Sequence, residues 1–595
     1  MQTDLIRTTP TPRRSRPRGR APGPLRSRTL EQDTPVYDPS VTRLPDIGFR
    51  PTVPVLLRAA AKRYHDDDYI VMTDRRLSFE DAERRSGVLA KRLLAWGAGK
   101  GTRIGIVLPS STQFVVAFLA AARIGAIATL FSSTYRPAEL GRAMRLADVQ
   151  LLLAPRTLLG RDYEPHLEET VVGLASTSPP FGLPSMPYLR RIVVDGGSTR
   201  AWVTPVSIDD RTSVVTSSSD PIDGITDDLL QAVESEVSPA DPLLMIWTSG
   251  SSADPKGVVH THGVAVRKVS PQVGLFRLNS STPDSSTPGR AFMAMPLFWV
   301  GGPQNLLGCL FSGSALICQE RFEPDEALEL IERERCTTVA ASSVAGSVDR
   351  LRSHPEWARH DTSSLNLARV AKLSSRGHPT NFGMTETFGP HANRDLFDYK
   401  VVDPATGSPI PDGQEGEFCV RGFALMAAMY KREREEVLDA DGYYHTGDRG
   451  YLEKGDIYFT GRYSELIKSA GANVSPLEVE GVLQAIPEVK LALVFGVPSQ
   501  ERGEEVVAVL VPENGKTIDS SAVLQQCRSV LSAYKVPTRI YLKAIEEIPV
   551  LASGKPDKRS ARAAVADSAP SSGRIDTTPG SYTMVTPGSY TMVER

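Results

Sequence analysis

A run of small and hydroxyl-bearing residues that ends in a lysine is the stretch best suited to hold a polyphosphate. It spans residues 247–262 and reads WTSGSSADPKGVVHTH. Small residues let main-chain N–H groups approach phosphate oxygens, and hydroxyls and a lysine add donors and positive charge. A short apolar run at 243–246 precedes it and predicts a buried strand. The expected phosphate-contacting residues are Thr248, Ser249, Gly250, Ser251, Ser252 and Lys256.

This loop differs from the Walker phosphate loop, because the G-x-x-x-x-G-K-[ST] spacing is absent. Taken alone, it is also compatible with a Ser/Gly-rich surface loop. Residues nearer the C-terminus decide between these two interpretations. They contain four short motifs: NFGMTET at 381–387, GYYHTGD at 442–448, TGRYSELIKSAGANVSPLEVE at 460–480 and SGKPDK at 553–558.

The five stretches, in this order, make the chain resemble the adenylate-forming (AMP-binding) superfamily, in its acyl-CoA synthetase branch. The resemblance extends over about residues 46–563. It implies an ATP-dependent carboxylic acid–CoA ligase, in which acid and ATP give acyl-AMP and pyrophosphate and CoA then displaces AMP. Because the carboxylate and the α-phosphate are both anions, the first step needs cations that reduce their repulsion. ATP, Mg²⁺, CoA and a small-molecule acid are the expected ligands.

The motifs assign roles to single residues through this resemblance. Glu386 matches the glutamate that binds Mg²⁺, and Thr385 matches the threonine that touches the α-phosphate. Phe382 takes the place of the aromatic residue beside adenine. Asp448 matches the aspartate that accepts both ribose hydroxyls, and Arg462 is expected to contact the ribose as well.

The C-terminal motifs correspond to a mobile lid. Lys555 matches the lysine that enters the site during adenylation, a long cationic side chain suited to stabilising a transition state. Ser464 falls at the hinge position, where the family usually has Asp or Lys. Lys468 and Gly471 lie in the stretch that borders the entry path of the thiol in the family.

An apolar wall for the acid is expected at residues 295–302, MPLFWVGG, through Phe298, Trp299 and Gly301. Trp299 stands where the family usually has His, and it is equally compatible with an ordinary core position. Such a wall suits an aliphatic or an aromatic acid. A place in secondary-metabolite biosynthesis rests on analogy alone.

One segment is shorter than the family pattern. Residues 367–382 leave no room for the helix that usually precedes the Gly-x-Thr-Glu motif, and about 15 residues are missing, the length of one helix. Two alternatives to the CoA ligase stay open, and the short segment is the reason for the second. One is an acyl-AMP ligase that loads a separate carrier protein, and the other is a catalytically silent nucleotide-binding relative.

Alternating helix and strand patterns predict an α/β fold. Ser78 is expected to cap a helix that ends near Gly97, and residues 103–108 predict a buried strand. The expected architecture is a large N-terminal domain of stacked, largely parallel sheets with helices, plus a small α+β C-terminal lid. The expected boundaries are a tail at 1–45, the AMP-binding domain at 46–461, the lid at 462–563 and a second tail at 564–595.

Bulk composition gives no argument for a nucleic-acid or membrane partner, since the net charge is −2. The apolar stretch 114–132 is interrupted by Arg123 and Gly125, which predicts helix, turn and strand rather than a membrane span. Five scattered cysteines favour reduced thiols and a cytoplasmic location. The Arg-rich N-terminus resembles a mitochondrial presequence in composition, but its prolines oppose the helix that one needs.

Overall fold

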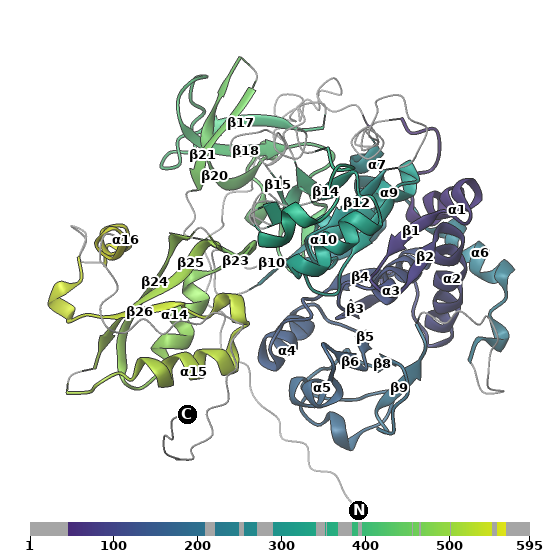
Figure 1. The fold of residues 1–595 in the computed structure, drawn as a ribbon, viewed down its shortest axis with the longest axis horizontal. Helices are drawn as coiled ribbons and strands as arrows, with labels where there is room; N and C mark the ends of the chain where they lie inside the picture. The colour runs from purple at the N-terminus through teal and green to yellow at the C-terminus, as the bar shows by residue number, and fades with distance from the viewer. Residues whose placement is uncertain are drawn as a thin grey trace, which may run out of the picture. The chain divides into compact units, whose positions relative to one another are not determined.

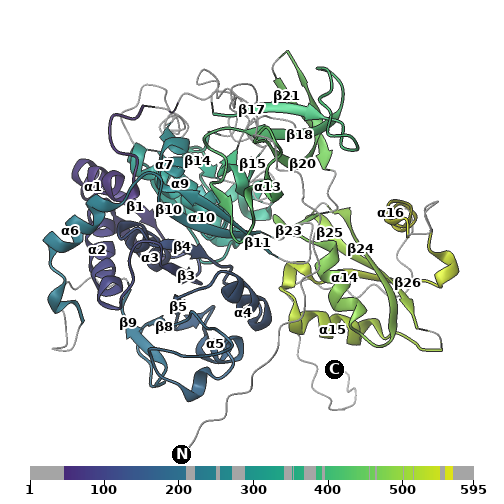
Figure 2. The ribbon, with the colours of Figure 1, turned by 180° about the vertical axis from the view of Figure 1, so that it is seen from behind.

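The computed structural model describes the chain from residue 44 to residue 566, with internal gaps. The described residues are 44, 46–208, 221–248, 255–270, 289–340, 351–352, 354–366, 383–390, 396–454, 456–462, 466–499, 501–513, 515–549 and 556–566. Figure 1 shows their helices and strands, with labels where there is room, and Figure 2 shows them from behind.

The largest sheet has eight described strands in the order β19-β11-β10-β4-β3-β5-β8-β9. All pairings from β10 to β9 are parallel, whereas β11 pairs antiparallel with both β10 and β19. Parallel strands buried on both faces are typical of an α/β fold, which confirms the predicted class. In sheet order, the strands are β19 (Ala428–Met429), β11 (Lys256–Thr261), β10 (Pro242–Thr248), β4 (Ile127–Leu130), β3 (Arg103–Ile106), β5 (Leu151–Pro155), β8 (Arg191–Asp195) and β9 (Val203–Val206).

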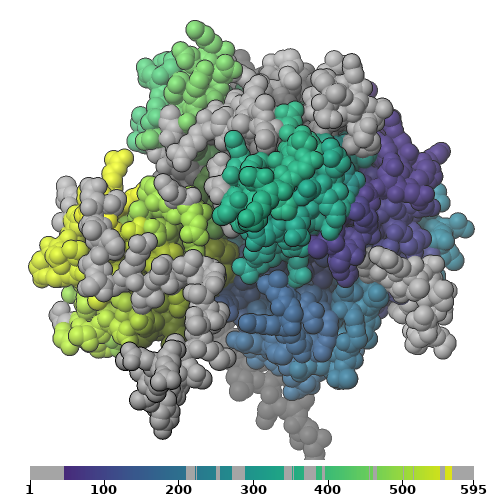
Figure 3. Space-filling model, viewed as in Figure 1, coloured from purple at the N-terminus to yellow at the C-terminus, as the bar shows by residue number. Residues whose placement is uncertain are grey.

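A second sheet has the order β14-β12-β13-β1-β2 and is parallel except between β1 and β2. Its strands are β14 (Thr338–Ala340), β12 (Arg290–Met293), β13 (Ala315–Cys318), β1 (Asp68–Val71) and β2 (Arg76–Ser78). Helix α10 (Pro324–Arg333) packs on one face through four buried residues, and its outer side lies at the surface of the molecule in Figure 3.

Other helices surround these two sheets, and α1, α2 and α3 pack on one another. They are α1 (Val53–Tyr64), α2 (Phe79–Ala95), α3 (Thr112–Arg123), α4 (Pro137–Leu146), α5 (Glu164–Thr170), α6 (Asp227–Glu236), α7 (His262–Val269), α9 (Gly301–Ser312) and α13 (Arg434–Val437).

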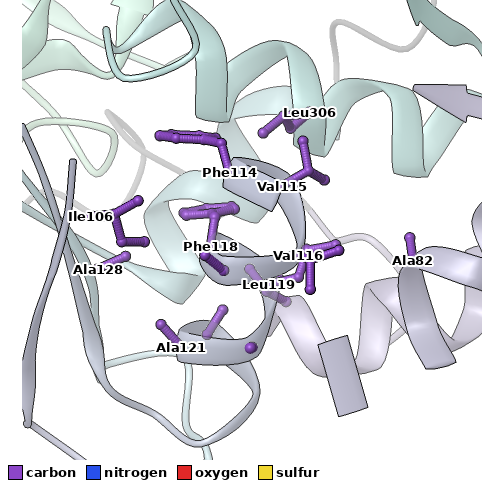
Figure 4. Packing of buried hydrophobic residues seen from close by; sticks show 14 of the residues in the cluster. Ala82, Ile106, Phe114, Val115, Val116, Phe118, Leu119, Ala121, Ala128 and Leu306 are labelled. Atoms are coloured by element: carbon purple, nitrogen blue, oxygen red, sulfur yellow. The ribbon is translucent and has the colours of Figure 1, made fainter. Parts of the chain in front are cut away.

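Helix α3 lies at the centre of the main core. Its sequence is apolar on every side, and the structure buries eleven of its twelve residues. Figure 4 shows Phe114 and Phe118 of α3 among Ile106 of β3, Ala128 of β4 and Leu306 of α9. A helix that is hydrophobic all round must be covered on all sides, and this one is enclosed by a sheet and two neighbouring helices.

Four strands form a separate antiparallel sheet in the order β17-β18-β20-β21. They are β17 (Asp398–Val402), β18 (Gly416–Arg421), β20 (Tyr444–Glu453) and β21 (Asp456–Arg462). The pattern of alternating helices and strands did not predict this sheet. Two of its strands carry Asp448 and Arg462, the residues predicted to contact the ribose.

The C-terminal part is α+β, as expected from the resemblance. Its sheet has the path β23-β22-β25-β24, with β26 parallel to β25. Its elements are β22 (Ile467–Ser469), β23 (Ala472–Val474), α14 (Pro476–Gln484), β24 (Val489–Ser499), β25 (Gly503–Pro512), α15 (Ser520–Val530), β26 (Arg539–Leu542) and α16 (Lys558–Ala566).

Local predictions made from the sequence hold at several points. Ser78 caps α2, because its hydroxyl accepts from the Asp81 amide at 3.1 Å. The apolar stretch 114–132 forms α3, a turn at Gly125 with φ of 66°, and β4. None of the helices in the described ranges is both long and apolar enough to cross a bilayer. All five cysteines are buried and unpaired with one another, in agreement with reduced thiols.

A buried histidine joins two helix starts and should make stability depend on pH. The Val53 amide donates to His262 Nδ1 at 3.2 Å, so the ring must be neutral to accept. Burial lowers the pKa of His262 to about 3; the charge of Asp241 opposes this shift, and the charge of Lys100 adds to it. The unfolded chain takes up this proton near pH 6.5 and the folded chain does not. Stability from His262 is therefore complete above pH 6.5 and is lost as pH falls towards 3.

We predict that His262→Asn, which keeps an acceptor but cannot titrate, weakens this dependence. Thermal unfolding midpoints of both proteins at pH 7, 6 and 5 provide the measurement. The wild type should lose up to about 1.4 kcal/mol per pH unit more than the variant. Parallel losses in the two proteins would show that His262 does not carry the effect.

Candidate active site

The ends of the phosphate loop are fixed by a strand pair. Thr248 ends β10 and Lys256 begins β11, and the two residues are register partners. Partners in an antiparallel pair point to the same face, so both side chains face one side of the sheet. His260 lies four residues after Lys256 and shares that face. Ser249, Gly250, Ser251 and Ser252 lie outside the described residues.

Gly257, in the Pro-Lys-Gly sequence, is required by packing across the same strand pair. A Cβ there would lie 3.0 Å from Met245 Sδ and 3.1 Å from the Trp247 ring. Its carbonyl accepts from the Tyr430 amide at 2.7 Å, which joins β11 to the segment after β19. The glycine therefore lets β11 lie close beneath Trp247 while the phosphate loop emerges from its end.

Thr385 and Glu386 lie in a tight hairpin between β15 (Gly383–Met384) and β16 (Gly389–Pro390). A Cβ on Gly383 would lie 2.9 Å from the backbone of β16, and one on Gly389 would overlap the Gln304 side chain of α9. Gly389 also has φ of 95°, which favours glycine. Glycine at position 383 therefore lets the backbone of β15 lie close to that of β16. Glycine at position 389 lets β16 lie close to the Gln304 side chain of α9.

Two buried side chains, His260 and Lys268, donate hydrogen bonds to backbone carbonyls of this hairpin. His260 Nε2 lies 2.7 Å from the Thr385 carbonyl oxygen, and burial lowers the pKa of His260 to about 4. The neutral ring therefore donates its Nε2 proton to this carbonyl. Lys268 donates to the Pro390 carbonyl and lies 4.4 Å from the Phe397 ring centroid. Burial lowers the pKa of Lys268 to about 7.

The Glu386 motif is joined to the strand that carries Asp448. The Tyr444 hydroxyl, at the start of β20, donates to Glu386 Oε1 at 3.1 Å. The Met426 amide donates to the Glu386 carbonyl at 2.7 Å, which fixes the backbone at the same point. The structure therefore brings the proposed metal ligand to the strand of the proposed ribose ligand.

Asp448 and Arg462 come together across two strands. They are register partners in the pairing of β20 with β21, so their backbones lie directly opposite each other. Asp448 is buried, and its amide donates to the Thr446 hydroxyl at 3.0 Å. The side chain of Arg462 lies outside the described atoms, so only its backbone place is fixed.

The expected acyl wall lies where α9 begins. Phe298 is buried and Trp299 is partly buried against the main core, and Gly301 starts the helix. A Cβ on Gly301 would lie 2.4 Å from Met295 Sδ. One turn further along the helix, Gln304 lies against Gly389, so this end of α9 adjoins the Thr385–Glu386 hairpin.

The expected CoA-side residues form a short hairpin in the C-terminal part. Lys468 lies in β22, and its amide donates to Glu504 Oε2 at 2.8 Å. Ala470 and Gly471 connect β22 to β23 with φ of 50° and 84°. Positive φ at both central residues is the geometry of a two-residue hairpin turn, which explains the glycine.

Phe382, Ser464 and Lys555 lie outside the described residues, as does the shortened segment 367–382. The structure also reveals residues that the motifs did not assign. His260 and Tyr444 lie inside the motif stretches but had no expected role, whereas Lys268 and Glu417 gave no signal in the sequence. The pairing of distant segments brings His260 and Tyr444 to the 381–387 motif, Lys268 to the end of its hairpin and Glu417 to the 442–448 motif.

Comparison with known proteins agrees with this arrangement. The AMP-binding enzyme family model matches residues 57–430, and the AMP-binding enzyme C-terminal domain matches residues 478–555. Among curated relatives, the putative acyl-CoA synthetase YngI of Bacillus subtilis (strain 168) is 25% identical, over 86% of this chain and 96% of its own length. The 4-coumarate--CoA ligase 5 of Oryza sativa subsp. japonica is 27% identical, over 89% of this chain and 98% of its own.

Solved structures show the same fold. The amide bond synthetase McbA from Marinactinospora thermotolerans aligns with a TM-score of 0.66 and 23% identity, covering 85% of this chain and 99% of that chain. The o-succinylbenzoate CoA synthetase MenE from Bacillus subtilis aligns with a TM-score of 0.64 and 21% identity, covering 85% and 97%.

The fold and the motif-bearing strands define an adenylate-forming enzyme, and the chain belongs to the AMP-binding enzyme family. It is an ATP-dependent carboxylic acid–CoA ligase that works through an acyl-adenylate. Of the three functions compatible with the sequence, the CoA ligase is thus the one that the relatives support.

Removal of the His260 ring should disturb the hairpin that presents Thr385 and Glu386. We predict that His260→Ala lowers acid-dependent ATP–pyrophosphate exchange by about 10- to 100-fold, because a buried carbonyl loses its donor at a cost of about 1–3 kcal/mol. His260→Gln, whose amide can still donate, should retain most of the activity. The exchange rate of each variant, measured on protein shown to be folded by circular dichroism, is the test. Equal losses in both variants would contradict the role of the hydrogen bond.

Proposed function

We propose that the described strand ends bind ATP in a fixed order along the nucleotide. Asp448 accepts the ribose hydroxyls with Arg462 beside it, and Thr385 contacts the α-phosphate. Lys256, together with the hydroxyl and amide donors of residues 248–252, binds the outer phosphates. The support is that Thr248 and Lys256 share a face of the sheet with His260, which itself contacts Thr385.

We propose Glu386 as the protein ligand of Mg²⁺. Its carboxylate oxygen is a hard donor, and one carboxylate with nucleotide phosphates is the usual environment of this ion. The Tyr444 hydroxyl at Oε1 holds the carboxylate in one orientation, as a hydrogen bond from outside the ligand shell commonly does. When bound, the ion would reduce the charge between substrate carboxylate and phosphate.

With ATP bound in this way, the reaction proceeds in two steps. A carboxylate oxygen of the acid attacks the α-phosphorus, the bond to the bridging oxygen breaks, and pyrophosphate leaves. Lys555 stabilises the developing negative charge. The lid, residues 462–563, then turns about Ser464, and Lys468 and Gly471 border the path of the CoA thiol. Its sulfur forms the thioester bond as AMP leaves the acyl carbon.

We propose an aromatic carboxylic acid as the substrate class to test first. Phe298 and Trp299 place apolar rings beside the start of α9, and that end of the helix adjoins the Glu386 hairpin. Several relatives carry the name 4-coumarate--CoA ligase, which refers to an aromatic acid. Medium-chain aliphatic acids form the comparison set. Beside CoA, a separate carrier protein is the second acceptor to test.

The cytoplasm is the proposed location.

Acid-dependent ATP–pyrophosphate exchange tests this function. We predict exchange with at least one aromatic acid, and a loss of about 100-fold or more in Lys555→Ala, because the variant lacks a charge that acts in the transition state. Lys543→Ala is the matched control, since Lys543 is an exposed lysine of the same domain paired with Glu547. Addition of CoA to the responsive acid should yield its thioester.

Three outcomes would separate the alternatives. Pyrophosphate exchange without formation of a CoA thioester would favour a carrier protein as the acceptor of the acyl group. ATP binding without exchange, for any acid, would contradict catalysis by this chain. Equal activity in the Lys555 and Lys543 variants would contradict the role assigned to Lys555.

A further inference from the structure

The pairing of β20 with β18 is irregular at Asp448. In the pairing of β18 with β20, Glu417 is opposite Arg449 and Cys419 is opposite His445. One residue of β18, Phe418, therefore faces three of β20, residues 446–448. This is a β-bulge, a feature that re-aims a side chain at the cost of ladder hydrogen bonds. Gly447 at its centre has φ of 69°, which favours glycine.

Side chains replace the hydrogen bonds that the bulge removes. The Gly447 amide donates to Glu417 Oε1 at 2.9 Å. The Thr446 hydroxyl donates to the Phe418 carbonyl at 2.8 Å and accepts from the Asp448 amide at 3.0 Å. Each of these bonds spans the bulge or crosses to β18. The direction of Asp448 is therefore set by Thr446 from within the bulge and by Glu417 from the neighbouring strand.

Glu417 uses both of its carboxylate oxygens for this purpose. Its Oε2 lies 3.0 Å from His445 Nδ1, on the residue immediately before the bulge. A carboxylate accepts only, so the ring nitrogen donates. Its side chain is only 15% exposed, which limits competition from water. Charge-assisted bonds of this kind are stronger than neutral ones. Glu417 thus contacts the bulge at two points, at His445 immediately before it and at Gly447 in its centre.

We propose that Glu417 is a positioning residue for the ribose-binding carboxylate of Asp448. It does not touch the nucleotide, and it acts by fixing the bulge from which Asp448 projects. Because a ribose pair must be met by both carboxylate oxygens, a shift of the bulge weakens recognition of the hydroxyls more than recognition of the rest of ATP. The proposal rests on the nucleotide role proposed above for Asp448.

The test compares binding of ATP with binding of 2′,3′-dideoxy-ATP, which lacks both ribose hydroxyls. Dissociation constants are measured by titration calorimetry on the full chain without acid. We expect the wild type to prefer ATP by about 10- to 100-fold. In Asp448→Ala and in Glu417→Ala this preference should fall below about 3-fold. Glu417→Gln, whose amide oxygen can still accept from Gly447, should keep most of the preference.

Cys419→Ala is the matched control, because Cys419 lies two residues along β18 and its Sγ is 3.5 Å from His445 Nδ1. It makes none of the bonds that cross the bulge, so its preference should equal that of the wild type. A Glu417→Ala protein that binds both nucleotides more weakly, but with the wild-type preference, would overturn the proposal in favour of general loosening. If Asp448→Ala also keeps the preference, the ribose role of Asp448 fails, and the positioning role fails with it.

Discussion

The hydrogen bond from the Tyr444 hydroxyl to the Glu386 carboxylate is the contact on which the site depends. Glu386 lies in a hairpin beside the large sheet, whereas Tyr444 begins a strand of the antiparallel sheet. The bond therefore joins the hairpin proposed to contact the phosphates to the strand proposed to contact the ribose. Four residues after Tyr444 the same strand presents Asp448. ATP spans both parts, so their spacing must match the nucleotide before it binds.

Hydrogen bonds from buried side chains explain how a short hairpin can hold Thr385 and Glu386 in one place. The Thr385–Glu386 hairpin is anchored by buried His260 and Lys268, which donate to carbonyls near its two ends. These donors are expensive to bury, and burial lowers the pKa of both groups. Such an arrangement persists because each buried carbonyl would otherwise lack a partner. Glycines at 383 and 389 complete the support by allowing backbone and the Gln304 side chain to approach.

Local features were predictable from the sequence, and distant pairings were not. The Ser78 cap, the burial of α3 and the strand before the phosphate loop each depend on neighbouring residues, so periodicity and capping reveal them. The roles that the motifs assign to Glu386 and Asp448 stay predictions, although the structure joins Glu386 to the strand of Asp448 through Tyr444. The contact of His260 with Thr385 joins residues 125 positions apart, and that of Glu417 with Gly447 joins residues 30 apart. Strand pairing sets both contacts, and a single sequence carries no local signal for it.

We propose that Tyr444 couples Glu386, the proposed metal ligand, to the nucleotide site, and a magnesium titration tests this coupling. Acid-dependent pyrophosphate exchange is measured against Mg²⁺ concentration for the wild type, Tyr444→Phe and Tyr443→Phe. Tyr443 is the matched control, since its hydroxyl donates to Asp398 instead. Tyr444→Phe should need about 10-fold more Mg²⁺ for half-maximal exchange, because a metal ligand that has lost its orienting hydrogen bond binds the ion more weakly. An unchanged Mg²⁺ requirement in Tyr444→Phe would contradict this role of Tyr444.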